Sequence, residues 1–346
     1  MKPKIVLLCP PLAGIPEGIA SGFERAGCAV SAFSYGLVKG NRFKRMFPGF
    51  AEWERTRKFN RALLGPVRRA VEKDGCDLLL VLKGARLHPR AEQFLASLQN
   101  SMALWTFDSL GRVPGQGALA GYASHAFYMD EGDVHGDHAS WLPLGYDERL
   151  YRFAPGPKEF DVLFVGALGT QYRRRLAFLE ALSRSPLPDR LRVGLVGSTG
   201  SRAGDRKINL HPKIMHIAPH LPPEDFAACI SRSRICVNIH QDDGSKPVNP
   251  LFFAIPGTGV CQVAEDLPHL ARWLEPERHF IPSSLAALPM TLETLLLEPD
   301  RTRRVAEAGR REVAERHTYA RRAETILSTL GMGRTPQLDP IGNTHD

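Results

Sequence analysis

The sequence of 346 residues lacks any long apolar run. Its continuous apolar stretches, such as residues 5–9 and 78–82, are far shorter than the roughly 18 residues that a membrane span needs. The basic start meets Pro10 and Pro11 soon after its first apolar residues, so it is typical of a strand and not of a secretory signal. We therefore expect a cytoplasmic protein. No repeat of solenoid length is visible either.

Cysteine is scarce, with six residues and no C-x-x-C pair. This argues against a disulfide framework and against a zinc ribbon. The acidic loop at residues 130–138 also contains two histidines, which could ligate a metal. No second cluster completes a ligand set, so a polar surface loop is the preferred interpretation. We expect no metal site.

Positive charge is unevenly distributed. The net charge is +8, and residues 42–69 alone carry nine Lys or Arg against two Glu, a net of +7. Aromatic residues alternate with these cations, which suits an anionic membrane surface or an acceptor held by Arg42, Lys44, Arg45 and Trp53. The same composition suits a nucleic-acid backbone, and it also suits a solvated helix with its aromatics in the core. The sequence leaves these alternatives open.

Short apolar runs alternate with amphipathic segments along the chain, which predicts parallel sheets covered by helices on both faces. A Pro- and Gly-rich linker at residues 153–158 divides this rhythm into two α/β units. We expect an N-terminal Rossmann-like domain at residues 1–152, a second at 153–330, and a frayed tail at 331–346. The predicted strands are residues 4–9, 29–33, 77–83, 101–105, 125–129, 139–142, 160–165, 191–196, 214–217, 234–239 and 260–263. The predicted helices are residues 16–26, 55–74, 89–99, 173–183, 223–232, 250–255, 285–297, 300–316 and 319–330.

Several segments, in this order and at this spacing, resemble the CgeB-like (spore-coat-type) group of GT-B glycosyltransferases: residues 76–84, 104–109, 141–147, 160–166 and 315–322. Residues 208–330 resemble the group-1 glycosyltransferase domain of that group. The resemblance implies an α/β GT-B fold whose two doubly wound domains face a cleft. It also implies transfer of a sugar from a nucleoside-diphosphate sugar, held by the C-terminal domain, to a glycan, protein or other hydroxyl acceptor held by the N-terminal one. No cofactor beyond this donor is expected.

One position departs from the resembled group. Phe253 stands where its members usually carry a glutamate that commonly binds the donor ribose. The alternative function is therefore a degenerate GT-B protein that binds a nucleotide or glycan without turnover. A third alternative, suggested by the basic segment, is a transferase that acts on nucleic acid.

Glycines and polar residues that follow the predicted strands are the candidate donor contacts, because ligands of open parallel sheets bind outside the carboxyl ends of the strands. Arginine suits diphosphate oxygens, and glycine lets a backbone approach a ligand closely. These candidates are Gly14, Gly166, Arg173, Gly197, Asn238, His240, Lys246 and Asn249. The resemblance adds Gly257 and Thr258, which keep the small-residue turn of the resembled group.

An inverting transfer needs a group that accepts the proton of the acceptor hydroxyl. Asp108 follows a predicted buried strand of the acceptor domain and is the first candidate for this base. His88 is the second. Asp108 is also a candidate helix N-cap, which is the alternative for that residue.

Overall fold

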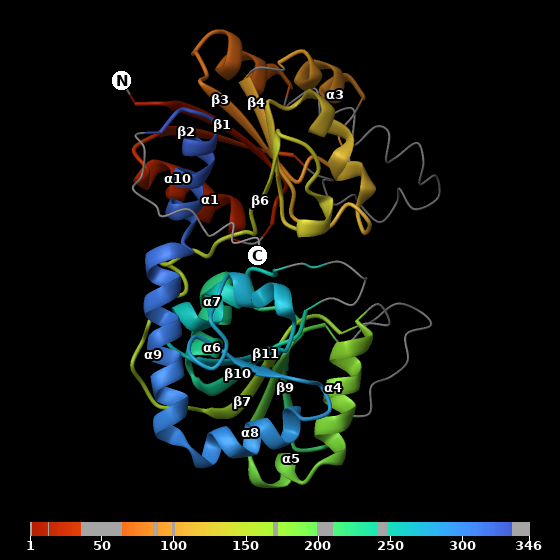
Figure 1. Cartoon of the computed structure of the whole chain (residues 1–346), viewed down its shortest axis with the longest axis vertical. Helices are drawn as coiled ribbons and strands as arrows, with labels where there is room; N and C mark the ends of the chain where they lie inside the picture. The colour runs from red at the N-terminus through yellow and green to blue at the C-terminus, as the bar shows by residue number, and fades with distance from the viewer. Residues whose placement is uncertain are drawn as a thin grey trace, which may run out of the picture.

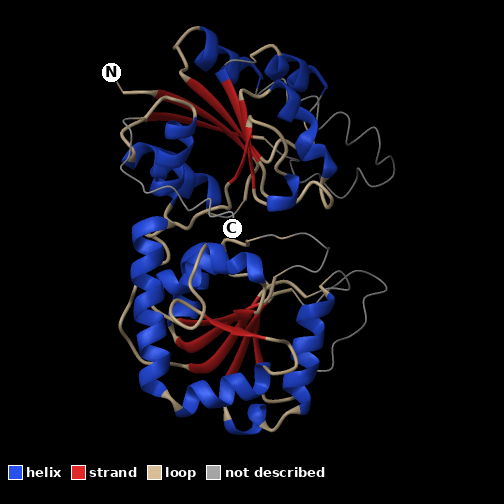
Figure 2. Cartoon of the chain, in the orientation of Figure 1, coloured by secondary structure: helices blue, strands red, loops and turns tan. Residues whose placement is uncertain are grey.

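The computed structural model describes residues 2–12, 14–35, 64–85, 87, 89–98, 101–168, 172–198, 210–240, 246 and 248–333. They form two α/β domains, each built on a six-stranded parallel sheet with helices on both faces (Figures 1 and 2). The two doubly wound sheets predicted from the alternating pattern are thus confirmed. None of the described helices combines the length and hydropathy that a membrane crossing requires.

The N-terminal sheet has the strand order β2-β1-β3-β4-β5-β6. Its first strand is buried along five of six residues, as expected of a strand that is covered on both faces. Gly14 precedes the first helix with a positive φ of 75°, a conformation that costs glycine little. The strands are β1 Lys4–Cys9, β2 Ala29–Ser34, β3 Leu78–Leu82, β4 Met102–Trp105, β5 His125–Tyr128 and β6 Ala139–Trp141. The helices are α1 Ile15–Arg25 and α3 Pro89–Ala96, with 3-10 helices η3 Pro114–Tyr122 and η4 Glu131–Asp133.

The C-terminal sheet has the order β12-β11-β10-β7-β8-β9. Its strands are β7 Phe160–Val165, β8 Val193–Val196, β9 Ile214–Ala218, β10 Ser233–Asn238, β11 Cys261–Glu265 and β12 Ile281–Ser283. Its helices are α4 Arg173–Arg184, α5 Leu187–Arg190, α6 Pro223–Ser231, α7 Leu251–Gly257, α8 Leu288–Leu297 and α9 Pro299–Arg316, with the 3-10 helix η5 Pro268–Arg272. The chain ends its described part with α10 Tyr319–Thr329.

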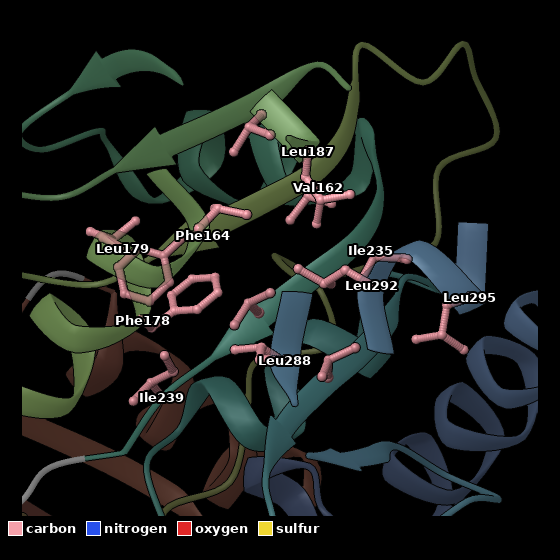
Figure 3. Packing of buried hydrophobic residues seen from close by; sticks show 14 of the residues in the cluster. Val162, Phe164, Phe178, Leu179, Leu187, Ile235, Ile239, Leu288, Leu292 and Leu295 are labelled. Carbon is pink, nitrogen blue, oxygen red and sulfur yellow. The ribbon is translucent and has the colours of Figure 1, made fainter. Parts of the chain in front are cut away.

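The core of the C-terminal domain lies on both faces of its sheet. Along β7, Val162 and Phe164 belong to one hydrophobic cluster, while Leu163 and Val165 belong to another. Figure 3 shows Phe164 beside Phe178 of α4, and their ring centroids are 5.6 Å apart. The alternation follows from the two-residue period of a strand, which sends successive side chains to opposite faces. This packing fixes where β7 ends and α4 begins.

The last helix returns to the N-terminal domain. Figure 1 shows α10 beside α1, and its Tyr319, Ala323 and Ile326 belong to the same buried cluster as β1. The sequence predicts this helix but assigns it to the C-terminal domain at residues 153–330. The structure corrects this assignment, because the apolar face of α10 packs against α1, where Gly18 and Gly22 leave room for Tyr319. The two domains are therefore linked twice along the chain, near Tyr146 and near Thr318, which form a parallel β-bridge.

Candidate functional site

Both sheets have a point where the strand order reverses. In the C-terminal sheet it lies between β7 and β10, because the chain adds β8 and β9 on one side and then β11 and β12 on the other. In the N-terminal sheet it lies between β1 and β3. Ligands of open α/β sheets bind outside the carboxyl ends of the strands at such points. The candidate site is built from the residues that follow these strands.

Arg175 of α4 joins the loops after β7 and β10. Its guanidinium donates from Nη1 to the carbonyl of Ala167 at 3.0 Å and from Nε to the carbonyl of Ile239 at 3.0 Å. It also lies 4.5 Å from the ring centroid of Tyr172. Burial lowers the pKa of Arg175 from its ordinary value. Arg175 thus fixes the backbone at the reversal point of the C-terminal sheet.

The first turn of α4 consists of three arginines, Arg173, Arg174 and Arg175. Arg173 is exposed, whereas Arg174 forms an ion pair with Glu265 at 3.3 Å. The N-terminus of a helix carries partial positive charge, so cations are unfavourable there and anions are favourable. Arg173 is therefore the exposed cation of this terminus that is suited to phosphate oxygens, while Arg174 and Arg175 are engaged with the protein.

Glu265, at the carboxyl end of β11, contacts both Arg174 and the loop after β10. It is buried, and its Oε2 accepts a hydrogen bond from the backbone N–H of His240 at 2.7 Å. The His240 ring is also buried, with Nδ1 3.7 Å from Glu265 Oε2, and burial lowers its pKa despite the nearby carboxylate. The predicted donor residue His240 therefore lies at the site, held by Glu265.

On the N-terminal domain, Asp108 lies at the end of β4 between two cations. Its carboxylate is 2.9 Å from Lys83 Nζ and 3.8 Å from Arg112 Nη1. Lys83 has a positive φ of 70°, which is uncommon for a residue with a side chain and directs it out of the strand end. The buried Gln116 donates to the carbonyl of Asp108 and accepts from the N–H of Phe107. Asp108 is thus a partly buried, held carboxylate.

The Asp108 group and the start of α4 meet across the two domains. Arg112 Nη2 donates to the hydroxyl of Tyr172 at 3.4 Å, and its guanidinium lies 5.9 Å from the same ring. Because Arg175 packs on Tyr172 as well, this ring connects Asp108 to the arginine cluster. The structure therefore brings together the Asp108 group, the start of α4 and the loop that holds His240, which the sequence predicted from separate segments.

A second contact between the domains involves Lys246. Its backbone N–H donates to both carboxylate oxygens of Asp130 at 3.2 Å, and its ammonium lies 3.6 Å from Glu131. Arg272 forms an ion pair with Glu131 as well. Asn238 and Asn249 exchange side-chain hydrogen bonds beside this contact, and Asn249 Oδ1 accepts from the N–H of Phe252 in α7. Asn238 is buried and holds the loop in place.

A third contact lies at Gly14, which packs near Pro223 at the start of α6. A cavity of about 450 Å³ adjoins it, lined by three carboxylates, Glu17, Asp147 and Glu224, and by Arg149. This acidic lining does not favour a diphosphate. The structure therefore does not join Gly14 to the arginine cluster in one phosphate site.

Gly166 and Gly197 have a packing role at the strand ends. A Cβ at Gly197 would lie 1.9 Å from the carbonyl oxygen of Gly166, so the turns after β7 and β8 touch. Gly257 and Thr258 are corrections to the predicted donor set. They end α7 and precede β11, which places them at the amino edge of the sheet, opposite to the site. A Cβ at Gly257 would meet the Tyr146 ring at 2.5 Å.

Phe253 is fully buried at the junction of the domains. Its ring stacks on His317 with centroids 4.5 Å apart, and the guanidinium of Arg322 lies 5.2 Å from it. The side chain thus belongs to a packed cluster with Trp273 and Val313. It takes no part in the contacts that surround Arg173 and Asp108.

Other predicted residues lie outside the described part of the chain: the candidate base His88 and the surface residues Arg42, Lys44, Arg45 and Trp53. Within the described residues, no group of three or more His, Cys, Asp or Glu could hold a metal ion.

Four residues of the site were not singled out by the sequence: Lys83, Arg112, Tyr172 and Glu265. Lys83 and Glu265 carried a usable signal, because each directly follows or ends a buried apolar strand. Arg112 and Tyr172 carried none, since their meeting depends on how the domains are joined.

Comparisons with known proteins agree with this architecture. Residues 173–328 match the family model described as "Glycosyl transferase-like". No curated protein matches the chain. Among solved structures, HepE from Anabaena in complex with UDP-glucose has a TM-score of 0.63 at 14% identity, over 95% of this chain and 99% of that one. Sucrose-phosphate synthase from Thermosynechococcus elongatus has a TM-score of 0.64 at 15% identity, over 94% and 98%.

An alpha-glucosyltransferase in complex with UDP and a 13-mer DNA has a TM-score of 0.68 at 11% identity, over 95% of this chain and 99% of that one. At such low identity these likenesses concern the fold. The chain therefore has the two-domain GT-B fold of glycosyltransferases, and its residues 173–328 carry a glycosyl transferase-like sequence.

Proposed function

We propose that this protein is a CgeB-like glycosyltransferase that moves a sugar from a nucleoside-diphosphate sugar to a hydroxyl acceptor. The observation that carries the proposal is the arginine cluster at the start of α4. It lies at the reversal point of one sheet and contacts the Asp108 group of the other domain through Tyr172. Of these arginines, Arg173 is exposed. Its guanidinium is always charged, as binding of a diphosphate requires.

We propose the following reaction at these positions. The bond from the sugar C1 to the diphosphate oxygen breaks, and a bond from C1 to the acceptor oxygen forms. The negative charge that develops on the leaving diphosphate is stabilised by Arg173 and by the N-terminus of α4. The acceptor proton passes to the carboxylate of Asp108, which Lys83 and Arg112 hold in place.

The ligands of the structural neighbours support a UDP-sugar as the donor. HepE was solved with UDP-glucose and with UDP, and the alpha-glucosyltransferase was solved with UDP. We therefore propose a UDP-sugar as the first donor to test.

The test is release of UDP from UDP-glucose, with and without a panel of glycan acceptors. We expect Asp108→Asn to lower kcat by about 10²–10⁴-fold with little change in KM, because general-base catalysis contributes about that much. Asp137→Asn, an exposed residue of the same domain, is the matched control. Binding of UDP without any turnover across UDP-sugars would instead support the degenerate binding protein.

A second candidate acceptor is nucleic acid. It is favoured by the net charge of +7 over residues 42–69 and by the DNA bound to one structural neighbour. If this acceptor is correct, binding to a DNA duplex weakens steeply with salt, because phosphate contacts release counterions. Binding that is insensitive to salt would exclude it. Docking of the same segment on an anionic membrane stays a prediction, since residues 42–63 lie outside the described part of the structure.

A further inference from the structure

A groove of about 500 Å³ lies at the amino edge of the C-terminal sheet. Lys158, Arg234 and Gly259 line it. Lys158 and Gly259 closely precede β7 and β11, and Arg234 is the second residue of β10. Helix α9 forms its other wall. The groove is therefore at the opposite edge of the sheet from the arginine cluster of α4. We call it the α9 groove.

The lining of the α9 groove is strongly cationic. One carboxylate, Glu307, lines it, against five cations: Lys158, Arg234, Arg303, Arg310 and Arg311. Arg234 and Arg303 have partners outside the groove, Asp161 at 3.5 Å and Asp300 at 2.9 Å. Lys158 donates one hydrogen bond to the carbonyl of Ser231 at 2.6 Å. Lys158, Arg310 and Arg311 form no ion pair with another of the described residues. The groove thus favours an anion.

An aromatic ring lies in the same groove. Phe153, from the linker between the domains, is 53% exposed although it packs tightly on Gly259, where a Cβ would lie 2.4 Å from the ring. The guanidinium of Arg310 lies 5.3 Å from the Phe153 ring centroid. A fixed, half-exposed ring beside an arginine is a stacking surface for a planar group.

We propose that the α9 groove binds a nucleoside phosphate at a site separate from the donor cleft. The base stacks on Phe153 beside Arg310, and Lys158 and Arg311 receive the phosphate. The volume of about 500 Å³ lies within the range of small-molecule pockets and exceeds the need of a free phosphate. Because Phe153 belongs to the linker, the bound ligand contacts the segment that joins the two domains.

The first test is calorimetric titration of the whole protein with AMP. We expect Arg311→Glu and Arg310→Ala to weaken AMP binding about ten-fold or more, because the first removes a charge-assisted contact to the phosphate and the second removes the guanidinium beside the stacked base. Arg304→Glu is the matched control, since Arg304 is an exposed arginine of the same helix that does not line the groove. It should leave AMP binding unchanged. Absence of AMP binding, or equal loss in Arg304→Glu, would overturn the proposal.

Two further measurements test whether AMP binds in the α9 groove and whether its base stacks on Phe153. Arg173→Ala should leave AMP binding unchanged; if it weakens AMP as much as Arg311→Glu does, AMP binds in the donor cleft and the proposal is wrong. Phe153→Leu should weaken AMP but not inorganic phosphate. Displacement of AMP by dodecyl phosphate at lower concentration than by UMP would show an acyl-chain site and overturn the assignment of a base.

Discussion

At the scale of single residues, His317 shows how the junction of the domains depends on one protonation state. Its Nε2–H donates to the carbonyl of Trp273 at 3.1 Å, so Nδ1 is free to accept from Arg322 Nη2 at 3.1 Å. A proton on Nδ1 would face that guanidinium. Burial and the neighbouring Arg322 accordingly lower the pKa of His317 well below its ordinary value of 6.5.

This arrangement predicts a loss of stability in mild acid. Below pH 6.5 the unfolded chain takes up a proton at His317 that the folded chain refuses, so the free energy of unfolding falls as the pH drops. The fall reaches at most about 1.4 kcal/mol per pH unit for one such histidine. Urea unfolding at pH 7.5, 6.0 and 5.0 measures it. His317→Gln should flatten the slope, and an unchanged slope would contradict the assignment.

The place of a polar residue in the fold could be predicted from the sequence where that residue follows a strand. The place of Asp108 in the fold was predicted in this way, because a polar residue after a buried apolar run lies beyond the carboxyl end of a strand. Its role as a base stays a prediction. Gly257 and Thr258 were misplaced for a related reason. They lie at the end of a helix and not of a strand, and Gly257 lets the Tyr146 ring pack closely on the backbone.

At the scale of elements, the contact between α1 and α10 is set by glycine. A Cβ at Gly22 would lie 2.5 Å from the backbone carbon of Tyr319, which leaves no room for any side chain. We expect Gly22→Ala to lower the free energy of unfolding by about 1–3 kcal/mol through overpacking. Gly121→Ala is the control, because a Cβ there meets nothing within 4 Å. Chemical denaturation compares the two variants, and equal stabilities would refute the packing argument.

The elements themselves were largely predictable, whereas their partners were not. Strands such as β7 were predicted with the observed bounds, since six apolar or alternating residues between turn signals specify them. Strand β12 was missed, because three residues with Pro282 in the middle carry no periodic signal. The sequence also could not show that α10 packs on the N-terminal sheet, as its apolar face would fit either domain.

At the scale of the whole molecule, the two domains touch where their strands end. Asp130 accepts a hydrogen bond from the backbone N–H of Lys246 in the other domain. Glu131 forms ion pairs with Lys246 and with Arg272 of that domain. We expect Asp130→Asn to loosen this contact, because an amide oxygen accepts the Lys246 N–H more weakly than a carboxylate does. Small-angle scattering should show a larger radius of gyration than for the wild type. Asp300→Asn, whose pair with Arg303 lies within one helix, should leave the radius unchanged.

The same comparison has an outcome that counts against this contact. If Asp130→Asn and the wild type scatter identically, the two acids do not hold the domains together. How the sheets face each other could not be read from the sequence, because the contacts between the domains join residues that are 60 or more positions apart.

The central claim is that the arginine cluster of α4 receives a nucleoside diphosphate. Calorimetric titration with UDP tests it most directly, with Arg173→Ala beside Arg184→Ala, an exposed arginine in the last turn of the same helix. The account predicts that UDP binds the wild type and Arg184→Ala alike and binds Arg173→Ala about ten-fold or more weakly. Equal UDP affinity in all three proteins would contradict it.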